Sequence, residues 1–311
     1  MMKKFILPAL LLMALVLGAC GNKQEDKSTE SAPKEDEGKS GTITYESEEG
    51  PVEVPADPQR VVVLASFAGN VMSLGVNLVG VDSWSKSNPR FESALQDVEE
   101  VSEENIEKII ELEPDLIIGF NTTKNIDKMK EIAPTVTYTY GNFDYLTQHI
   151  EIGKLLNKEE EATKWVEDFK QRAQDAGKEI KEKIGEDATV SVVEKFDKDL
   201  YVYGDSWGRG TEILYQEMKL AMPEKVKEAA MEPGYYALSS EVLPEFAGDY
   251  MILSMFDAAD NSFMETETYK NIPAVKNDRV FVANGDEFYF NDPLTLDYQL
   301  GFFKEHFLGT K

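Results

Sequence analysis

Arg209 carries the most specific chemistry in the sequence. The chain has five arginines, and this one lies between two glycines directly after a tryptophan, in the stretch Trp207-Gly208-Arg209-Gly210. A guanidinium presents a planar fork of N–H donors that matches oxygen-rich groups, and a neighbouring glycine lets the backbone approach a ligand closely. The stretch therefore predicts a site for an oxygen-rich ligand. The alternative is that Arg209 begins a helix and pairs with a nearby carboxylate.

Aromatic side chains lie near the ends of predicted strands in both halves of the chain. They are Phe67, Trp84, Phe120, Tyr138, Tyr140 and Phe143 in the first half, and Tyr201, Tyr203, Trp207, Tyr235, Tyr236, Phe288, Tyr289 and Phe290 in the second. A single aromatic residue is more often part of a core than of a ligand site. Several in loops of both halves favour a shared binding surface.

Residues for catalysis or metal binding are not evident. His149 and His306 both fall in predicted helices far from any strand end, where a solvated or packed role is expected. The sequence contains no GxSxG, P-loop or HExxH motif. Cys20 is the only cysteine, which excludes an intramolecular disulfide and a multi-cysteine metal site. We therefore expect a protein that is not an enzyme, with no catalytic residue, no cofactor and no metal ligand of its own.

The charge balance excludes one class of partner. Acidic residues outnumber basic ones by 58 to 32, for a formal net charge of −26. Nucleic acid is an unsuitable partner, because no basic face is available to neutralise phosphates. Acidity of this kind more often serves solubility.

The longest helical pattern covers 158–185, and α/β segments precede and follow it. Its apolar residues recur at spacings of three and four: Ala162, Trp165, Val166, Phe169, Ala173, Ala176, Ile180 and Ile184. Such a helix spans roughly 40 Å, which suits a connection between two lobes. The alternative is a long surface helix of a single domain.

Strands and helices alternate on both sides of this helix. The first half begins with a predicted hairpin over Thr42–Val54 that turns at Glu49-Gly50. Its predicted strands are Val61–Ala65, Leu78–Val81, Leu116–Phe120 and Thr135–Tyr138. Its predicted helices are Asn70–Leu74, Ser102–Leu112, Ile126–Ile132 and Tyr145–Leu156. The second half predicts strands over Thr189–Glu194, Leu200–Tyr203, Asp249–Ser254 and Arg279–Ala283, and helices over Gly210–Met218 and Pro293–Phe307. We therefore predict an α/β fold with two Rossmann-like lobes, 42–157 and 186–311, joined by the single long helix over 158–185, and a ligand cleft between the lobes.

The first 41 residues have a different character. Lys3 and Lys4 precede an apolar run that is too short to span a membrane as a mature helix. Leu17-Gly18-Ala19-Cys20 then resembles a bacterial lipobox, so we expect residues 1–19 to be a lipoprotein signal peptide and Cys20 to be lipidated. Residues 20–41 predict a flexible tether, because they carry almost no apolar side chain. An ordinary secretory peptide with an incidental cysteine is the alternative.

Motifs along the whole mature chain resemble the iron-siderophore substrate-binding proteins of ABC importers. They are Pro58-Gln59-Arg60-Val61-Val62, Ser73-Leu74-Gly75-Val76, Leu112-Glu113-Pro114-Asp115-Leu116-Ile117-Ile118, Ile132-Ala133-Pro134-Thr135, the stretch 203–210, the stretch 243–250 and the stretch 288–293. The stretches around Arg209 and Ala247 are more particular, and resemble the ferric hydroxamate-binding lipoproteins of Gram-positive bacteria.

This resemblance implies a periplasmic-binding-protein-like fold with a helical hinge, in a monomer anchored to the outside of the cell membrane. It implies that Trp207 and Arg209 contact the siderophore, and that Glu107 and Glu241 dock on arginines of the permease. Further pocket positions are less fixed by motif: Phe67, Trp84, Tyr140, Tyr203 and Tyr289. The iron arrives already chelated.

The chemistry of the predicted pocket agrees with a hydroxamate. Three hydroxamate anions balance Fe³⁺, so the chelate is nearly neutral and suits aromatic walls with one arginine. A tris-catecholate carries about three negative charges and requires several basic groups to offset its desolvation. Arg209 is the one cation in a pocket-forming motif, with Lys86 as a second candidate. Mixed carboxylate siderophores, catecholates, haem and cobalamin are alternative ligands, and a surface enzyme or adhesin is the alternative class.

Overall fold

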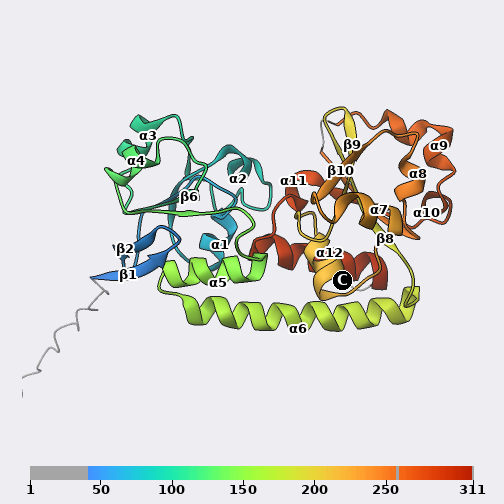
Figure 1. Cartoon of the computed structure of the whole chain (residues 1–311), viewed down its shortest axis with the longest axis horizontal. Coiled ribbons are helices and arrows are strands. Elements are labelled where there is room, and N and C mark those ends of the chain that lie inside the picture. The colour runs from blue at the N-terminus through green and yellow to red at the C-terminus, as the bar shows by residue number, and fades with distance from the viewer. Residues whose placement is uncertain (1–40, 257–258, 310–311) are drawn as a thin grey trace, which may run out of the picture. The chain divides into compact units, whose positions relative to one another are not determined.

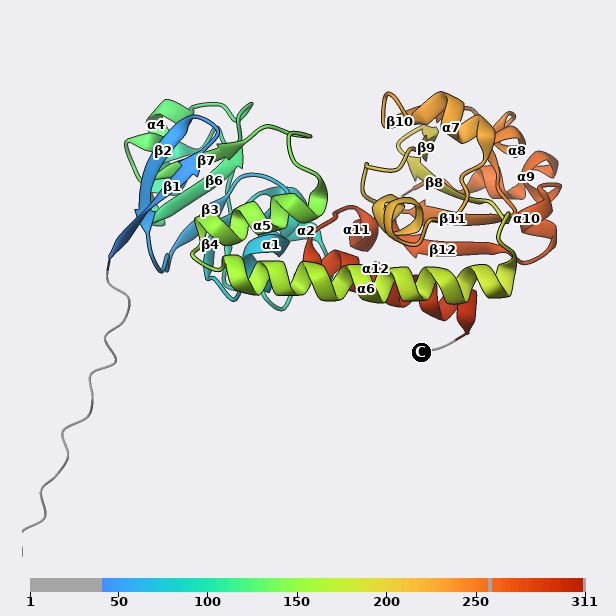
Figure 2. The ribbon, with the colours of Figure 1, turned by 60° about the horizontal axis from the view of Figure 1, so that its bottom comes forward.

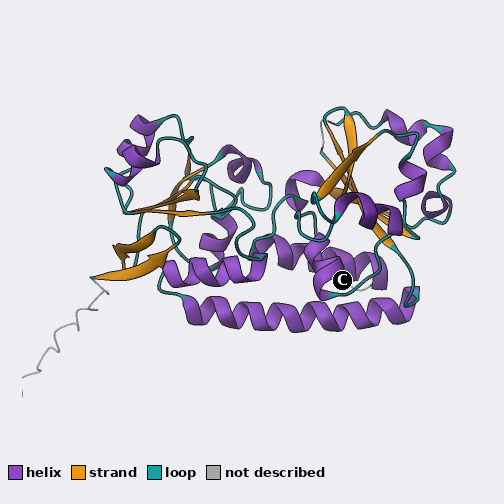
Figure 3. Ribbon diagram, in the orientation of Figure 1, coloured by secondary structure: helices purple, strands orange, loops and turns teal. Residues whose placement is uncertain are grey.

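The computed structural model describes residues 41–256 and 259–309, which form two α/β lobes and a long helix that links them (Figure 1). The predicted signal peptide, Cys20 and nearly all of the tether lie outside the described residues. Among the described helices, none is long and apolar enough to cross a membrane. Helices cover the sheets of both lobes (Figure 3).

The N-terminal lobe is built on a parallel sheet with the strand order β5-β4-β3-β6-β7. Its strands are β3 (Val61–Val63), β4 (Leu78–Val81), β5 (Glu99–Glu100), β6 (Leu116–Phe120) and β7 (Thr135–Tyr138). Its helices are α1 (Ala68–Ser73), α2 (Ser83–Ser87), α3 (Ile106–Glu111), α4 (Ile126–Lys130) and α5 (Tyr145–Leu155). The apolar runs of β3 and β6 are buried, as expected for strands of a parallel sheet that is covered on both faces. The predicted hairpin is β1 (Thr42–Ser47) with β2 (Gly50–Pro55).

The C-terminal lobe repeats this strand order, as β10-β9-β8-β11-β12, but with mixed directions. Its strands are β8 (Val190–Phe196), β9 (Asp199–Tyr203), β10 (Tyr235–Leu238), β11 (Tyr250–Met255) and β12 (Val280–Asn284). β8, β11 and β12 run parallel to one another. β9 runs antiparallel to both of its neighbours, β8 and β10. The loop between β8 and β9 is too short for the crossover that a parallel pair requires. The shared order is that of the first five strands of the Rossmann order 3-2-1-4-5-6, which confirms the predicted fold class.

The helix predicted over Pro293–Phe307 is confirmed as α12 (Pro293–Leu308). Six further helices in the described part of this lobe were not predicted from the sequence: α7 (Glu224–Ala230), α8 (Leu243–Phe246), η2 (Ser262–Glu265), α9 (Glu267–Lys270), α10 (Pro273–Lys276) and α11 (Gly285–Phe288). The helix predicted over Gly210–Met218 is a π-helix, η1 (Glu212–Glu217). Most of the missed helices have four residues, which is too short for a helical period to show.

The linking helix α6 covers Glu159–Ile184, close to the predicted range. Its buried stripe contains most of the predicted apolar positions, and it packs against α5 of one lobe and α12 of the other (Figure 2). Gly177 belongs to the same stripe. A Cβ at Gly177 would lie 2.6 Å from the backbone of Met218, so this glycine lets η1 approach the helix.

A second connection joins the lobes, which the sequence did not predict. The ring of Phe290 is part of the N-terminal core and stacks on Phe91 at a centroid distance of 6.0 Å. Asp292 follows, caps α12 and is 1% exposed. A Cβ at Gly69 in α1 would lie 1.9 Å from the Asp292 carboxylate, so only glycine allows α12 to pack on α1 here. The chain therefore crosses between the lobes at α6 and again before α12.

Candidate ligand-binding cleft

Two adjoining cavities of about 430 and 520 Å³ lie between the lobes, and residues of both lobes line each of them. Five residues line both cavities: Ser66, Phe120, Tyr140, Trp207 and Asn291. The N-terminal members lie at or just after the carboxyl ends of β3, β6 and β7. This is the edge of an open α/β sheet at which ligands bind. The volumes are in the range of small-molecule sites.

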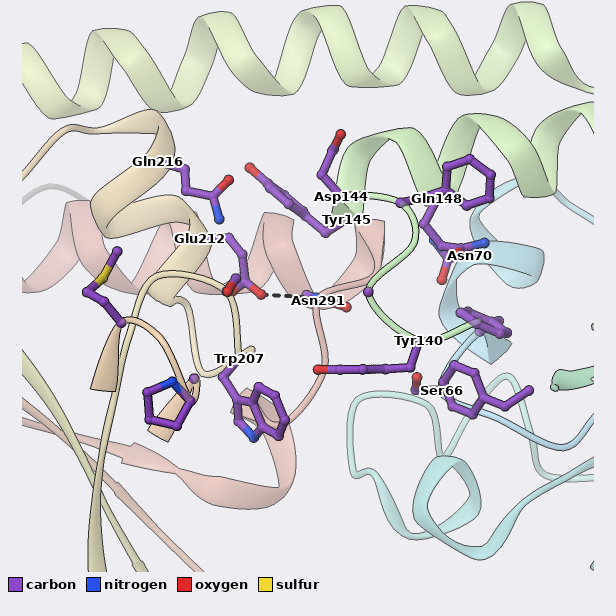
Figure 4. Close-up of a pocket in the computed structure, with 18 of the residues that line it drawn as sticks. Ser66, Asn70, Tyr140, Asp144, Tyr145, Gln148, Trp207, Glu212, Gln216 and Asn291 are labelled. Carbon is purple, nitrogen blue, oxygen red and sulfur yellow. Dashed lines mark hydrogen bonds between the residues drawn. The ribbon is translucent and has the colours of Figure 1, made fainter. Parts of the chain in front are cut away.

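Aromatic pairs meet across the cleft. Trp84 after β4 stacks on Tyr289 after α11, with a centroid distance of 4.6 Å and an interplanar angle of 15°. Tyr140 after β7 meets Trp207 edge to face at 5.5 Å. Figure 4 shows Tyr140 and Trp207 extending toward each other from opposite sides of the cleft. Trp84 and Tyr140 are 43% and 59% exposed, so both rings are available to a ligand.

Arg209 lies at the edge of the larger cavity, in a strained turn. It has a φ of 58° between two glycines that also have positive φ. A Cβ at Gly208 would lie 2.5 Å from the carbonyl oxygen of Tyr289, and one at Gly210 would lie 2.5 Å from the ring of Phe303. These glycines therefore allow close packing within the protein. Gly208 also lines the larger cavity, so the approach of the backbone to a ligand at this position stays a prediction.

The guanidinium of Arg209 is paired with a carboxylate that the sequence analysis did not identify. Its Nε and Nη2 donate to Glu194 at 3.1 and 2.9 Å, and its Nη1 donates to the carbonyl oxygen of Trp207 at 3.1 Å. The rings of Tyr203 and Tyr289 lie 4.8 and 4.3 Å from the guanidinium carbon. Burial alone would lower the pKa of Arg209, but the charge of Glu194 raises it overall. Both interpretations of Arg209 therefore apply: it forms an ion pair and it lines the cleft.

The smaller cavity is more polar and includes a buried carboxylate. Glu212 in η1 is 1% exposed and accepts hydrogen bonds from the backbone N–H of Gly208 at 2.9 Å and from the amide of Asn291 at 3.0 Å (Figure 4). Burial raises the pKa of Glu212, and these hydrogen bonds oppose that shift. Tyr145 also lines this cavity, and its hydroxyl donates to Glu217 at 3.3 Å and links the two lobes.

The structure places the predicted pocket residues in three groups. Residues that line one or both cavities are Phe67, Trp84, Tyr140, Trp207, Arg209 and Tyr289. Tyr203 is 3% exposed in β9 and lines neither cavity, but its hydroxyl donates to Glu194 at 2.6 Å and so supports the ion pair. Lys86 is not a pocket cation, because its amine donates to the carbonyl oxygens of Leu95 and Val98 at 2.5 and 2.6 Å.

The predicted docking residues lie away from the cavities, one on each lobe. Glu107 is in the first turn of α3, and Glu241 lies just before α8. Both side chains are exposed. A hydrogen bond from the Ser239 hydroxyl lowers the pKa of Glu241, so its carboxylate is charged at neutral pH.

The polar residues that the sequence analysis missed include Glu212 and Asn291, which line the cleft, and Glu194, which lies behind Arg209. Glu194 had a signal in the sequence, because it follows the apolar pair Val192-Val193 in a predicted strand and a buried carboxylate needs a partner. Asn291 stands beside Tyr289 and Phe290 in a motif that was noted only for its aromatic residues. Glu212 had no such signal, since it follows Arg209 in a segment that is rich in polar residues.

Comparisons with known proteins agree with this architecture. A sequence profile of the family described as "Periplasmic binding protein" matches residues 65–287. The "Iron(3+)-hydroxamate-binding protein FhuD" of Bacillus subtilis (strain 168) is 38% identical over 304 residues, which cover 96% of this chain and 95% of the relative. The "Probable siderophore-binding lipoprotein YfiY" of the same organism is 30% identical and covers 89% of each chain.

Among solved structures, FhuD2 of Staphylococcus aureus with bound ferrioxamine B is similar to this chain. The TM-score is 0.77 and the sequence identity is 33%, over 81% of this chain and 99% of that structure. Both lobes and the linking helix are thus shared with a solved ligand complex.

Proposed function

Because the chain belongs to the periplasmic binding protein family, we propose that it binds a ferric hydroxamate siderophore and delivers it to an ABC permease. Family membership also confirms the expectation that the chain is a solute receptor and not an enzyme. The relative with 38% identity is named for iron(3+)-hydroxamate binding, and the similar FhuD2 structure holds a ferric hydroxamate.

The observation that carries the proposal is the composition of the cleft. Trp84, Tyr140, Trp207 and Tyr289 provide aromatic walls, and the charge of Arg209 is already balanced by Glu194. A ferric tris-hydroxamate is nearly neutral, so it can leave water for such a cleft without a large desolvation cost. Its iron is saturated by the chelator, so the protein does not have to supply a metal ligand.

Arg209 orients the chelate. A guanidinium has five N–H donors, and the Nε, Nη1 and Nη2 of Arg209 each use one of them within the protein. The two that remain, one on Nη1 and one on Nη2, are the donors for hydroxamate oxygens. The Glu194 pair holds the guanidinium plane in place, so little side-chain entropy is lost when the ligand binds.

The receptor acts at the outer face of the cell membrane, held there by lipid on Cys20. The lipobox at Leu17-Gly18-Ala19-Cys20 supports this part of the proposal, as does the word lipoprotein in the name of a relative with 30% identity. Glu107 and Glu241 each meet an arginine of the permease. Their exposure on separate lobes supports this. A permease that contacts both residues could sense the position of one lobe relative to the other.

A panel of ligands tests the proposal. The body from Gly41 onward is titrated as a monomer with ferric hydroxamates, a ferric catecholate, ferric citrate, haem and cobalamin, with tryptophan fluorescence as the signal. We expect saturable quenching by at least one ferric hydroxamate, because Trp84 and Trp207 line the cleft. Tight binding of the catecholate without a response to any hydroxamate would overturn the ligand assignment.

A further inference from the structure

Glu194 is a fully buried carboxylate whose hydrogen-bonding capacity is filled. It is 0% exposed and lies in β8 between Val193 and Lys195. Its Oε1 accepts from the hydroxyl of Tyr203 at 2.6 Å and from Nη2 of Arg209 at 2.9 Å. Its Oε2 accepts from Nε of Arg209 at 3.1 Å and from the hydroxyl of Ser254 at 2.9 Å. An ionised carboxylate offers about four acceptor sites, so this one has no capacity left for a ligand.

The partner of Glu194 is the one cation of the cleft. Among the described residues that line the two cavities, Arg209 is the only lysine or arginine. The other charged residues in that lining are acidic: Asp82, Asp144, Glu212 and Glu232. Because Glu194 cancels the charge of Arg209, the cleft offers N–H donors to a ligand without offering net positive charge.

We propose that Glu194 determines the charge selectivity of the cleft, so that nearly uncharged ferric chelates bind and anionic ones are disfavoured. This inference rests on the proposed function. Glu194 does not touch the ligand and acts through Arg209, as a positioning residue. Without its charge, the guanidinium would attract a chelate that carries about three negative charges, and a partly buried medium screens this attraction less than water does.

A purely structural role predicts a different result. If Glu194 only holds Arg209 in place, its loss weakens the binding of every chelate to a similar extent. If it sets the charge, its loss weakens hydroxamate binding but favours a catecholate, so the ratio of the two affinities changes. That ratio is the quantity to measure.

Glu194→Gln is the variant, because it removes the charge and keeps the shape. Ser254→Ala is the matched control, because it removes a hydrogen bond to the same carboxylate and leaves the charge of the ion pair unchanged. The dissociation constants of a ferric tris-hydroxamate and a ferric tris-catecholate are measured for the wild type and both variants, at low and high salt.

We expect the affinity ratio of catecholate to hydroxamate to rise on the order of ten-fold in Glu194→Gln, and to stay at the wild-type value in Ser254→Ala. This rise in the affinity ratio should be smaller at high salt, because salt screens the attraction between the guanidinium and the anionic chelate. An unchanged ratio in a folded Glu194→Gln protein would overturn the inference. A wild type that binds no hydroxamate would instead overturn the proposed function.

A second variant covers the case in which Glu194→Gln does not fold. The double variant Glu194→Gln with Arg209→Gln removes both charges of the pair, so the cleft keeps its net charge. We expect weaker hydroxamate binding without any gain in catecholate binding. A double variant that gains catecholate affinity would contradict the assignment, because no uncancelled cation is present to explain the gain.

Discussion

Tyr140 and Trp207 meet edge to face across the cleft, with ring centroids 5.5 Å apart and one ring from each lobe. Both rings line both cavities, so this pair lies where the two cavities adjoin. We therefore expect a bound chelate in either cavity to contact one or both rings.

Replacing Trp207 should reduce both the affinity for the ligand and the fluorescence signal. We expect Trp207→Ala to weaken hydroxamate binding by about 2 kcal/mol, as for an aromatic residue central to a binding site. Trp165→Phe is the control, because Trp165 packs on Phe169 in α6 and lines neither cavity. Titration of both variants checks this. An unchanged dissociation constant in Trp207→Ala would contradict the placement of the ligand against Trp207, whereas quenching alone can persist through Trp84.

Arg209 is expected to matter more for binding than any other arginine. Arg209→Ala would leave Glu194 buried and unpaired, which costs about 3–5 kcal/mol of stability and obscures the effect on binding. Arg209→Lys keeps the charge but loses the fork of donors, so we expect hydroxamate affinity to fall by about 1.5–3 kcal/mol. Arg279→Lys is the control. An unchanged dissociation constant for a folded Arg209→Lys protein would leave Arg209 with a structural role alone.

Asp292 should make stability depend on pH. Burial raises its pKa from 3.8 to about 6, although hydrogen bonds from Thr295 and the backbone oppose this shift. The folded state binds this proton more tightly than the unfolded state, so the stabilisation is complete below pH 3.8 and is lost as pH rises through about 6.

The variant that isolates this effect is Asp292→Asn, which can still cap α12 but does not titrate. Between pH 4 and 7, wild-type stability should fall relative to the variant by about 2 kcal/mol. Chemical denaturation of both proteins at several pH values measures the difference. A difference that does not change with pH would show that the buried carboxyl is not protonated near pH 4.

Docking should be separable from binding. Glu107→Ala and Glu241→Ala are each expected to leave hydroxamate affinity unchanged and to lower uptake in part, with the double variant most impaired, because exposed charges act mainly on encounter and orientation. Glu167→Ala, on the exposed face of α6, is the control. Normal uptake by cells that carry only the double variant would refute this role and would leave the ligand assignment intact.

Anchoring should depend on Cys20. We expect Cys20→Ala to leave ligand affinity unchanged but to release the protein from the membrane or to block its processing. Cell fractionation measures this. Retention of a mature, unlipidated variant at wild-type levels would contradict the proposed lipobox.

The elements that the sequence predicted are those with a strong local signal. Helix α6 has a long apolar period, and β3 and β6 are uninterrupted apolar runs, so their type and position could be derived from neighbouring residues. The aromatic residues of the cleft were predicted in the same way, as loop residues near strand ends. Tyr203 shows the limit of this reasoning, because it is near a strand end and yet belongs to the core.

The relationships that were missed depend on residues far apart in the sequence. Glu194 and Arg209 come together only because β8 and the turn after β9 are adjacent in the fold. The crossing before α12 depends on the fit of Gly69 against Asp292. The sequence around a glycine does not reveal which distant residue packs against it. Lys86 was a candidate for the cleft by sequence position alone, and backbone carbonyl oxygens bind its amine instead.

Calorimetric titration of the body from Gly41 onward with ferrioxamine B tests the central claim most directly. That chelate is bound in a similar solved structure and carries no negative charge on its iron centre. We expect saturable binding of one chelate per protein, weakened in Arg209→Lys and in Trp207→Ala. No binding of ferrioxamine B or of any other ferric hydroxamate, by a protein that is folded and binds a different iron chelate, would contradict the account.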